Sequence, residues 1–184
     1  HTWQLLFQNQ VPLRDQQLHP LFSEGIKKLG FNAEGVPDLN VINKKLKALT
    51  GFVGVPVTGL EDVEHFFTLL SQRQFPIGNF IRDKGDLSYT PAPDVFHDMY
   101  GHIPFFADKA YADFCQAVGK RALDLKHIPN AITYFNRYFW FTIEFALIKT
   151  PAGKRIFGAG IASSFTECAY ALSEKPEVVP FNLV

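Results

Sequence analysis

Two histidines placed close together could form part of a metal site. His97 and His102 lie five positions apart in the stretch PDVFHDMYGHIPFF, and the chain has only 6 histidines in 184 residues. Residues five apart on a straight α-helix point about 140° away from each other, because the helix has 3.6 residues per turn. We expect the helix to end or bend at Gly101, which would let the two imidazoles converge.

Glu144, in the stretch YFWFTIEFALI, is the third candidate ligand. The residues three and four positions away on a helix share its face. All of these neighbours are apolar: Trp140, Phe141, Leu147 and Ile148. A buried carboxylate without a partner costs several kcal/mol. Glu144 therefore needs a partner from outside its helix, either a distant lysine or arginine or a metal ion shared with the histidines.

Two histidines and one carboxylate with open positions suit non-haem Fe(II), which activates O₂. Zinc is the alternative, because two histidines and a glutamate also form hydrolytic sites. However, HDMYGH departs from the H-E-x-x-H zinc motif, since it has one residue too many and Asp98 in place of the glutamate. The pattern favours iron modestly, and two ordinary histidines without a metal are the remaining alternative.

The elements that position these residues are mainly helical. Helices are predicted at 18–29, 38–49, 62–72, from 94 to 101, 106–125, 130–149 and 165–172. Thr58 and Glu61 have capping-box spacing ahead of the third helix, as do Ser164 and Glu167 ahead of the last. Short extended pieces are expected at 52–57, 75–82 and 156–161. The two prolines of SYTPAPD exclude a helix there. The predicted fold is mainly α with a few short strands, irregular, and neither a Rossmann fold nor a barrel.

Composition indicates a single globular domain covering residues 1–184. The net charge is +0 with 18 basic and 18 acidic residues, which gives no electrostatic footprint for nucleic acid or an anionic membrane. No apolar run reaches the roughly 20 residues of a membrane span. Cys115 and Cys168 have no metal-type spacing, and reduced thiols in a cytoplasmic enzyme are the simpler interpretation. Because His1 is not a natural start, we expect a chain truncated at its beginning.

Several longer motifs resemble a known family. The stretches YTPAPDVFHDMYGHIPFF, WFTIEFALI, GAGIASSFTE and LSEKP, in this order and spacing, are similar to the pterin-dependent aromatic amino acid hydroxylases. TGFVGVPVTG and FIRDKGDLSYTP fit the same family. The resemblance runs from about Thr2 to Val184. It implies the irregular α-rich catalytic-domain fold of that family, with His97, His102 and Glu144 as ligands of Fe(II). It also implies that the chain stops before the family's C-terminal segment and oligomerising tail.

The resemblance also implies roles for other residues. Arg82 matches the arginine that pairs with the substrate carboxylate, a role that suits a guanidinium fork. The positions matching the amino acid pocket are Thr90, Pro93, Trp140, Gly160 and Ser163. Those matching the pterin site are Val57, Gly59, Phe66, Asp98 and Phe139, with Phe66 stacking on the ring and Asp98 at its polar edge. Alternatively, Phe66 belongs to the core and Phe67 stacks, or Ser163 only starts a helix.

The chain departs from the family pattern in places. Asp98 stands where many members have glutamate, and Phe139 stands where animal members have tyrosine. Glu61 and Val63 replace residues that usually lie along the pterin. These departures concern cofactor geometry and substrate choice more than the metal.

The implied activity is an Fe(II)- and tetrahydropterin-dependent monooxygenase with a tetrahydrobiopterin-like cofactor and O₂ as co-substrate. Its substrate is a small aromatic amino acid, with phenylalanine ranked first, tryptophan second and tyrosine third. The alternatives are a tryptophan hydroxylase of the same family, a zinc-dependent hydrolase, and a non-catalytic sensor of aromatic amino acids. We expect a monomer or weak oligomer with no nucleic acid or membrane partner.

Overall fold

The structure is a computed structural model that describes residues 1–59, 61–85, 87 and 92–182. Its α-helices are α1 (Thr2–Gln17), α2 (Pro20–Leu29), α3 (Leu39–Thr50), α4 (Val63–Ser71), α5 (Ile103–Phe106), α6 (Lys109–Asp124), α7 (Ala131–Phe139), α8 (Ala159–Ala162) and α9 (Phe165–Leu172). Two π-helical segments are η1 (His97–His102) and η2 (Trp140–Glu144). The strands are β1 (Val53–Pro56), β2 (Gln74–Ile77), β3 (Leu147–Thr150) and β4 (Gly153–Ile156).

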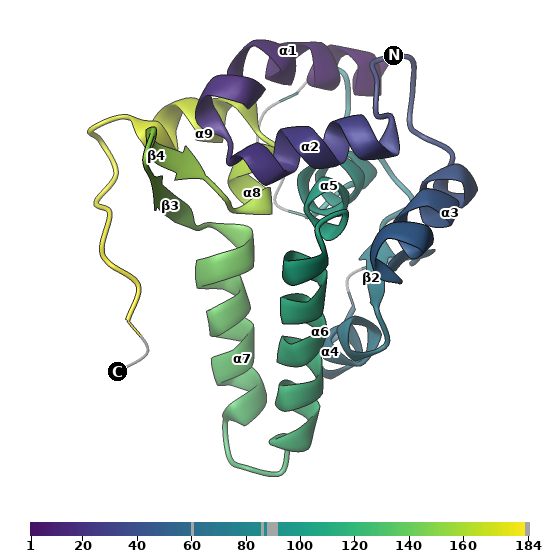
Figure 1. Cartoon of the computed structure of the whole chain (residues 1–184), viewed down its shortest axis with the longest axis vertical. Coiled ribbons are helices and arrows are strands. Elements are labelled where there is room, and N and C mark those ends of the chain that lie inside the picture. Colours follow the sequence, from purple (N-terminus) through teal and green to yellow (C-terminus); the bar gives the residue numbers. More distant parts are fainter. Residues whose placement is uncertain (60, 86, 88–91, 183–184) are drawn as a thin grey trace.

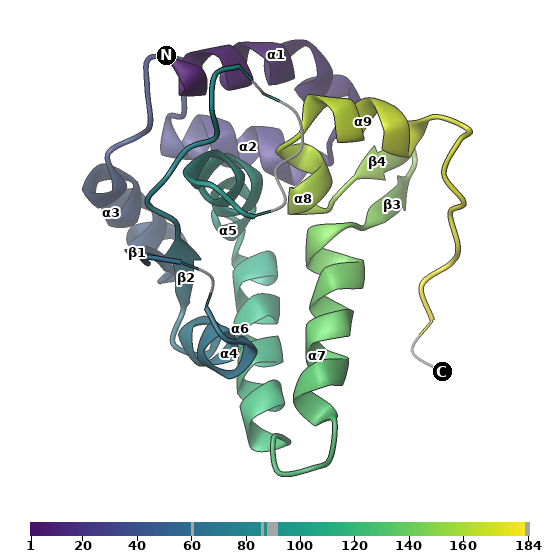
Figure 2. The same cartoon turned by 180° about the vertical axis from the view of Figure 1, so that it is seen from behind.

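The helices form two groups (Figures 1 and 2). α1 and α2 lie across one end of the molecule and cover α5, while α6 and α7 run antiparallel to each other toward the opposite end. The first group packs on an aromatic core in which the ring of Tyr100 lies 5.1 Å from Phe22 and 4.7 Å from Phe96, between ring centroids. Such ring pairs add attraction beyond the area they bury. The core therefore anchors η1, which carries the two histidines, to α1 and α2.

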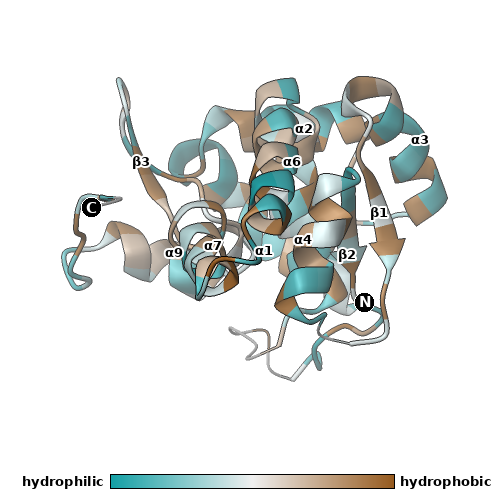
Figure 3. Cartoon of the chain, turned by 90° about the horizontal axis from the view of Figure 1, so that it is seen from below, coloured by the Kyte–Doolittle hydropathy of each residue, from teal (hydrophilic) through white to brown (hydrophobic). Residues whose placement is uncertain are grey.

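The strands form two separate pairs. β1 and β2 pair in parallel, with Val53 opposite Gln74, and α4 connects them. β3 and β4 form an antiparallel hairpin in which Leu147 lies opposite Ile156. Asn43, on α3, forms hydrogen bonds with both the N–H and the carbonyl of Gly54, at 2.7 and 2.8 Å, and so covers part of the open edge of β1. Figure 3 shows hydrophilic and hydrophobic residues alternating around α3, as expected of a helix with one buried face.

Most predicted helices are confirmed, with caps that explain their starts. Asp38 accepts a hydrogen bond from the Asn40 N–H at the start of α3, and Ser164 accepts one from the Glu167 N–H at the start of α9. α4 differs from the prediction, because Asp62 rather than Thr58 caps it by accepting from the His65 N–H at 3.0 Å. Glu61 is therefore not needed as part of a capping box.

Two predicted elements are wrong in part. The helix predicted at 130–149 ends its α-helical part at Phe139, becomes π-helical, and gives way to strand β3. The extended piece predicted at 156–161 begins at the last residue of β4, and its second half lies in α8. α1, which lies before the first predicted helix, buries Trp3, Leu6 and Phe7 together with the polar Gln10. Among the described residues, no helix is both long and apolar enough to cross a membrane.

Candidate metal centre

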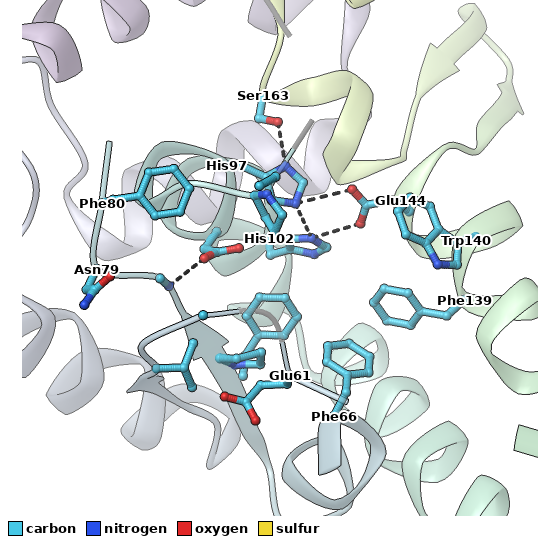
Figure 4. A pocket seen from close by; sticks show the side chains of 18 of the residues that line it. Glu61, Phe66, Asn79, Phe80, His97, His102, Phe139, Trp140, Glu144 and Ser163 are labelled. Atoms are coloured by element: carbon cyan, nitrogen blue, oxygen red, sulfur yellow. Dashed lines mark hydrogen bonds and ion pairs between the residues drawn. The ribbon is translucent and has the colours of Figure 1, made fainter. Parts of the chain in front are cut away.

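A cavity of about 530 Å³ lies where β2, η1, α7 and η2 meet. This volume is within the roughly 300–1,000 Å³ typical of small-molecule sites. The residues that line it are Val57, Gly59, Glu61, Val63, Phe66, Phe75, Pro76, Gly78, Asn79, Phe80, Arg82, Ala92, Pro93, His97, Asp98, His102, Asn136, Phe139, Trp140, Glu144, Ser163 and Ser164. They come from segments far apart in the sequence, and Figure 4 shows several of them around the opening.

The π-helical backbone of η1 brings the two histidines together. The Ile103 N–H binds the Asp98 carbonyl, which is the i→i+5 hydrogen bond of a π-helix. Residues five apart then lie on the same face, so His97 and His102 point in one direction, and their Nε2 atoms are 3.2 Å apart. A helix end at Gly101 is excluded, because η1 includes Gly101 and continues into α5. The predicted convergence is present through wider winding instead.

Glu144 reaches the histidines from the second π-helical segment. The Phe145 N–H binds the Trp140 carbonyl, again five positions back. The Glu144 Oε1 atom lies 3.3 Å from His97 Nε2, and Oε2 lies 3.1 Å from His102 Nε2 (Figure 4). Side-chain donor atoms of the three residues all lie within 4.8 Å of one another. The partner of Glu144 is therefore the histidine pair, as the metal-site interpretation of the sequence requires.

Gly160 makes room for the Glu144 carboxylate. A Cβ atom at position 160 would lie 2.6 Å from Glu144 Oε1 and 2.9 Å from the Phe145 ring. Because such contacts are shorter than van der Waals distance, any larger residue would displace the carboxylate. Gly160 is not among the described residues that line the cavity, and it lies against a candidate ligand.

Burial sets the charge states of the cluster. It lowers the pKa of His97 to about 4, so this imidazole is neutral at pH 7 and its Nε2 atom can carry a free electron pair. Burial alone would raise the pKa of Glu144, but the imidazoles of His102 and His97 more than reverse this effect. The pKa of Glu144 is therefore lowered, and its carboxylate stays ionised. Neutral imidazoles and an ionised carboxylate are the forms that bind a metal ion.

Ser163 orients one of the two imidazoles. Its Oγ atom lies 2.9 Å from His97 Nδ1, and the residue is 3% exposed. If Nε2 faces a metal, Nδ1 keeps the proton and its N–H donates a hydrogen bond to Ser163 Oγ, which fixes the tautomer and the ring orientation. Ser163 was predicted to line the amino acid pocket. It does line the cavity, but its hydroxyl contacts a candidate ligand, so it is more than the start of a helix.

Asp94 is a residue that the sequence interpretation missed. It is completely buried, and its Oδ1 atom accepts a hydrogen bond from the His97 N–H at 2.9 Å. The same carboxylate accepts from the Arg82 N–H, Nε and one terminal nitrogen at 2.8 to 2.9 Å. Burial opposes its ionisation, but these hydrogen bonds keep its pKa low. The signal available in the sequence was an Asp three residues before His97, where it can accept from that N–H.

Arg82 lines the cavity as the sequence predicted, with much of its fork held by Asp94. Its Nε and one terminal nitrogen face that carboxylate, and a guanidinium has five N–H donors in all. The pair fixes the direction of the side chain. The sequence predicts that this fixed guanidinium binds a substrate carboxylate.

An aromatic wall stands beside the cluster. The Phe66 ring lies 4.9 Å from Phe139 and 6.0 Å from Phe75, between ring centroids. Phe75 in turn lies 4.4 Å from the His102 ring. Phe66 lines the cavity, whereas Phe67 is completely buried in the core and does not. The structure therefore favours Phe66 over Phe67 as the ring available for stacking.

Asp98 lies at the polar side of this wall. Its Oδ2 atom accepts a hydrogen bond from the Gly78 N–H at 2.7 Å, and burial raises the pKa of the carboxyl to about 7. Val57 and Gly59 also line the cavity, as predicted, and so do Glu61 and Val63, two of the departures from the family pattern.

The predicted amino acid pocket is only partly described. Pro93 and Trp140 line the cavity, and the Trp140 ring stacks on Phe145 with centroids 5.3 Å apart. Thr90 lies outside the described residues. Asn79, Phe80 and Asn136 line the cavity as well and were not predicted. Amides and single aromatic residues on connecting segments carry little sequence signal of their own.

The donor set fits a metal ion. Two imidazole nitrogens and a carboxylate lie close to one another in the wall of the cavity. A metal held there would keep open positions facing that space. This arrangement matches the two-histidine, one-carboxylate set of non-haem Fe(II) sites, although the same donors also bind zinc.

Comparison with protein families and sequences gives one consistent result. The model of the biopterin-dependent aromatic amino acid hydroxylases matches residues 1–184. A phenylalanine-4-hydroxylase of Chromobacterium violaceum is 42% identical over 184 residues, covering 100% of this chain and 62% of the relative. The enzyme of that name from Caulobacter vibrioides is 41% identical over 186 residues, covering 99% and 62%. The chain thus spans about three fifths of the length of these curated relatives.

Solved structures agree. The phenylalanine hydroxylase from Legionella pneumophila aligns with a TM-score of 0.92 at 37% identity, covering 98% of this chain and 77% of that one. A Chromobacterium violaceum structure with bound iron(III) and 7,8-dihydrobiopterin aligns with a TM-score of 0.90 at 42% identity, covering 94% and 63%. The similarity confirms the predicted α-rich fold class.

Proposed function

Because the chain belongs to the biopterin-dependent aromatic amino acid hydroxylase family, we propose that it is an Fe(II)- and tetrahydropterin-dependent monooxygenase that converts L-phenylalanine to L-tyrosine. The convergence of His97, His102 and Glu144 at a cavity of about 530 Å³ carries this proposal. It is supported by similar Chromobacterium violaceum structures, one with iron(III) and 7,8-dihydrobiopterin and one with iron and phenylalanine.

His97, His102 and Glu144 are the residues that would hold the iron. Iron bound by such a set supplies the redox chemistry through which O₂ and a reduced pterin can react. The chain contributes the geometry: Ser163 holds the His97 ring through Nδ1, and Gly160 leaves the space that Glu144 occupies. Hydrogen bonds of this kind to ligand residues set the orientation and basicity of the ligands.

The aromatic wall positions the cofactor. Phe66 offers its ring face to the flat pterin, and Phe139, 4.9 Å away, limits how far the pterin can slide. Asp98 faces the cofactor's polar edge. Its carboxyl can accept or donate a hydrogen bond near pH 7, because burial raises its pKa to about 7.

Arg82 and Trp140 position the substrate. The Arg82 guanidinium, whose direction Asp94 fixes, lines the cavity and would bind the amino acid carboxylate. Trp140 offers an aromatic wall that fits the phenyl ring and crowds the bulkier indole of tryptophan. We propose no hydrogen-bond partner for a tyrosine hydroxyl among the described residues. We therefore rank phenylalanine first as substrate, tryptophan second and tyrosine third.

The remaining expectations concern the setting of the enzyme. We infer a small-molecule amino acid as substrate, a monomer or weak oligomer, and a cytoplasmic location. The two cysteines are free and buried, as in proteins of reducing compartments, and this supports the location.

Anaerobic reconstitution tests the function. The chain is loaded with Fe(II) or Zn(II) and then given a tetrahydropterin, O₂ and phenylalanine, tyrosine or tryptophan, with product analysis by mass spectrometry. We expect tyrosine from phenylalanine with Fe(II) and no hydroxylated product with Zn(II). Ligand binding without pterin oxidation would instead support an amino acid sensor. Hydrolytic activity with Zn(II) alone would support a metallohydrolase.

A further inference from the structure

Glu61 is a charged residue of the cavity that the proposed mechanism does not use. Among the described residues, the other charged or metal-binding side chains that line the cavity are Arg82, His97, Asp98, His102 and Glu144. Each of these has a place in metal, cofactor or substrate binding. Glu61 comes from the segment between β1 and α4, and Figure 4 shows it beside Phe66, opposite Ser163 and His97.

The carboxylate of Glu61 is held in position by α4. One oxygen contacts Nδ1 of His65, one helical turn further along the chain. The backbone of His65 is fixed in turn by the Asp62 cap, at 3.0 Å. Asp62 provides the helix cap, while Glu61 lines the cavity. No hydrogen bond to its second oxygen is formed within the described part of the chain, and the side chain is 21% exposed.

The negative charge of Glu61 is not neutralised by a nearby lysine or arginine. No lysine or arginine among the described residues forms an ion pair with it, and the cavity wall to which it belongs includes the apolar residues Val57, Val63, Phe66 and Pro76. A carboxylate next to apolar groups and partly shielded from water acts on a bound charge more strongly than a fully solvated one. A ligand that stacks on Phe66 would therefore have one edge near the Glu61 carboxylate (Figure 4).

We propose that Glu61 selects the cofactor by charge: it favours a pterin with a neutral side chain and disfavours a pterin whose substituent carries carboxylates. This inference rests on the proposed pterin-dependent function. The pterin ring itself is common to biopterins and folates. A biopterin has a neutral dihydroxypropyl group that can donate hydrogen bonds to Glu61, whereas a folate has a glutamate whose negative charges Glu61 repels.

Isothermal titration calorimetry of the Fe(II)-loaded chain under nitrogen measures this selection, with 7,8-dihydrobiopterin and 7,8-dihydrofolate as probes. The variants are Glu61→Gln, which keeps the shape and removes the charge, and Glu64→Gln as the matched control. Glu64 lies on α4, pairs with Lys126 and does not line the cavity.

We expect the wild type to bind dihydrobiopterin more tightly than dihydrofolate. The Kd for dihydrofolate divided by the Kd for dihydrobiopterin should shrink by at least about fivefold in Glu61→Gln, because the repulsion is electrostatic. The same ratio should stay unchanged in Glu64→Gln. Raising the salt concentration should also shrink the ratio in the wild type, because salt screens exposed charges.

The outcomes separate the inference from the proposed function. If the wild type binds dihydrobiopterin but Glu61→Gln leaves the ratio unchanged, the charge selection is wrong and the proposed function stands. If the wild type binds neither pterin, the proposed cofactor and this inference both fall. A thermal melt of Glu61→Gln that matches the wild type confirms that the comparison is between folded proteins.

Discussion

The two ends of the cavity are built in different ways. At the metal end, the candidate ligands lie on π-helical segments, and Asp94, Ser163 and Gly160 hold or make room for them inside the core. At the cofactor end, Glu61 and Gly59 lie on a connecting segment, partly exposed, and a Cβ atom at Gly59 would meet nothing within 4 Å. The positions of the candidate metal ligands therefore depend on buried packing, while part of the wall at the proposed cofactor end is open to solvent. Substitutions at the metal end should strongly affect stability and metal binding, and those at the other end should cost less stability and leave metal binding unchanged.

The largest difference in unfolding free energy between the two ends is expected when Asp94 at the metal end and Asp62 at the cofactor end are replaced. Asp94→Ala leaves the Arg82 guanidinium buried without its carboxylate, and breaking such a pair costs roughly 3–5 kcal/mol. Asp62→Ala removes only the cap of α4, which costs about 1 kcal/mol. Denaturant unfolding of both variants measures the free energies. Equal losses at the two positions would contradict the comparison.

The next difference concerns two glycines. Gly160→Ala places a methyl group 2.6 Å from the present position of Glu144 Oε1, so the carboxylate must move. We expect Fe(II) affinity to fall by roughly 10- to 100-fold, as for other residues that orient a ligand. Gly59→Ala is the matched control and should leave metal affinity unchanged. Competition with a chelator measures both constants, and a normal affinity in Gly160→Ala would show that Glu144 does not bind the metal in this position.

Arg82 tests the substrate side of the metal end. Arg82→Lys keeps the positive charge but loses the fork, so kcat/KM for phenylalanine should fall at least about tenfold, or about 1.4 kcal/mol. Bound iron should be unchanged, which separates substrate binding from a general distortion of the site. An unaltered kcat/KM would mean that another group binds the carboxylate.

The smallest expected effect is at the aromatic wall. Phe66→Ala removes a stacking surface worth about 0.5–1.5 kcal/mol, so the apparent KM for tetrahydropterin should rise by roughly two- to tenfold. The KM for phenylalanine should change less. Phe67 is the contrasting neighbour: it is buried in the core, and Phe67→Ala should lower the unfolding free energy by roughly 3–5 kcal/mol. A larger change in the KM for phenylalanine would place Phe66 in the other pocket.

The sequence predicted which residues form the metal end, but it did not predict the backbone conformation that carries them. His97, His102 and Glu144 could be identified because a buried glutamate needs a partner and few residue types can bind a metal. Their π-helical winding could not, because an i→i+5 hydrogen bond depends on how the segment packs and leaves no periodic pattern in the residues. Gly101 therefore suggested a helix end that does not exist.

Long-range contacts explain the other differences. The apolar run after Glu144 suits a helix or a strand equally, and its pairing with β4 decides the outcome. In α1, the buried Gln10 and the internal Pro12 disturb the helical pattern. Asp94 was overlooked because its partner, Arg82, lies in a different segment, and only the fold brings the two together.

Bound iron in the three candidate ligand variants tests the central claim most directly. The wild type, His97→Ala, His102→Ala and Glu144→Ala are loaded with Fe(II) under nitrogen, desalted and measured for iron per chain, with circular dichroism to confirm folding. His127→Ala and Glu174→Ala are controls, because both residues are exposed and lie outside the cluster. The account predicts one iron in the wild type and the controls, and none in the three variants. A full equivalent of iron in any folded variant of the three would contradict it.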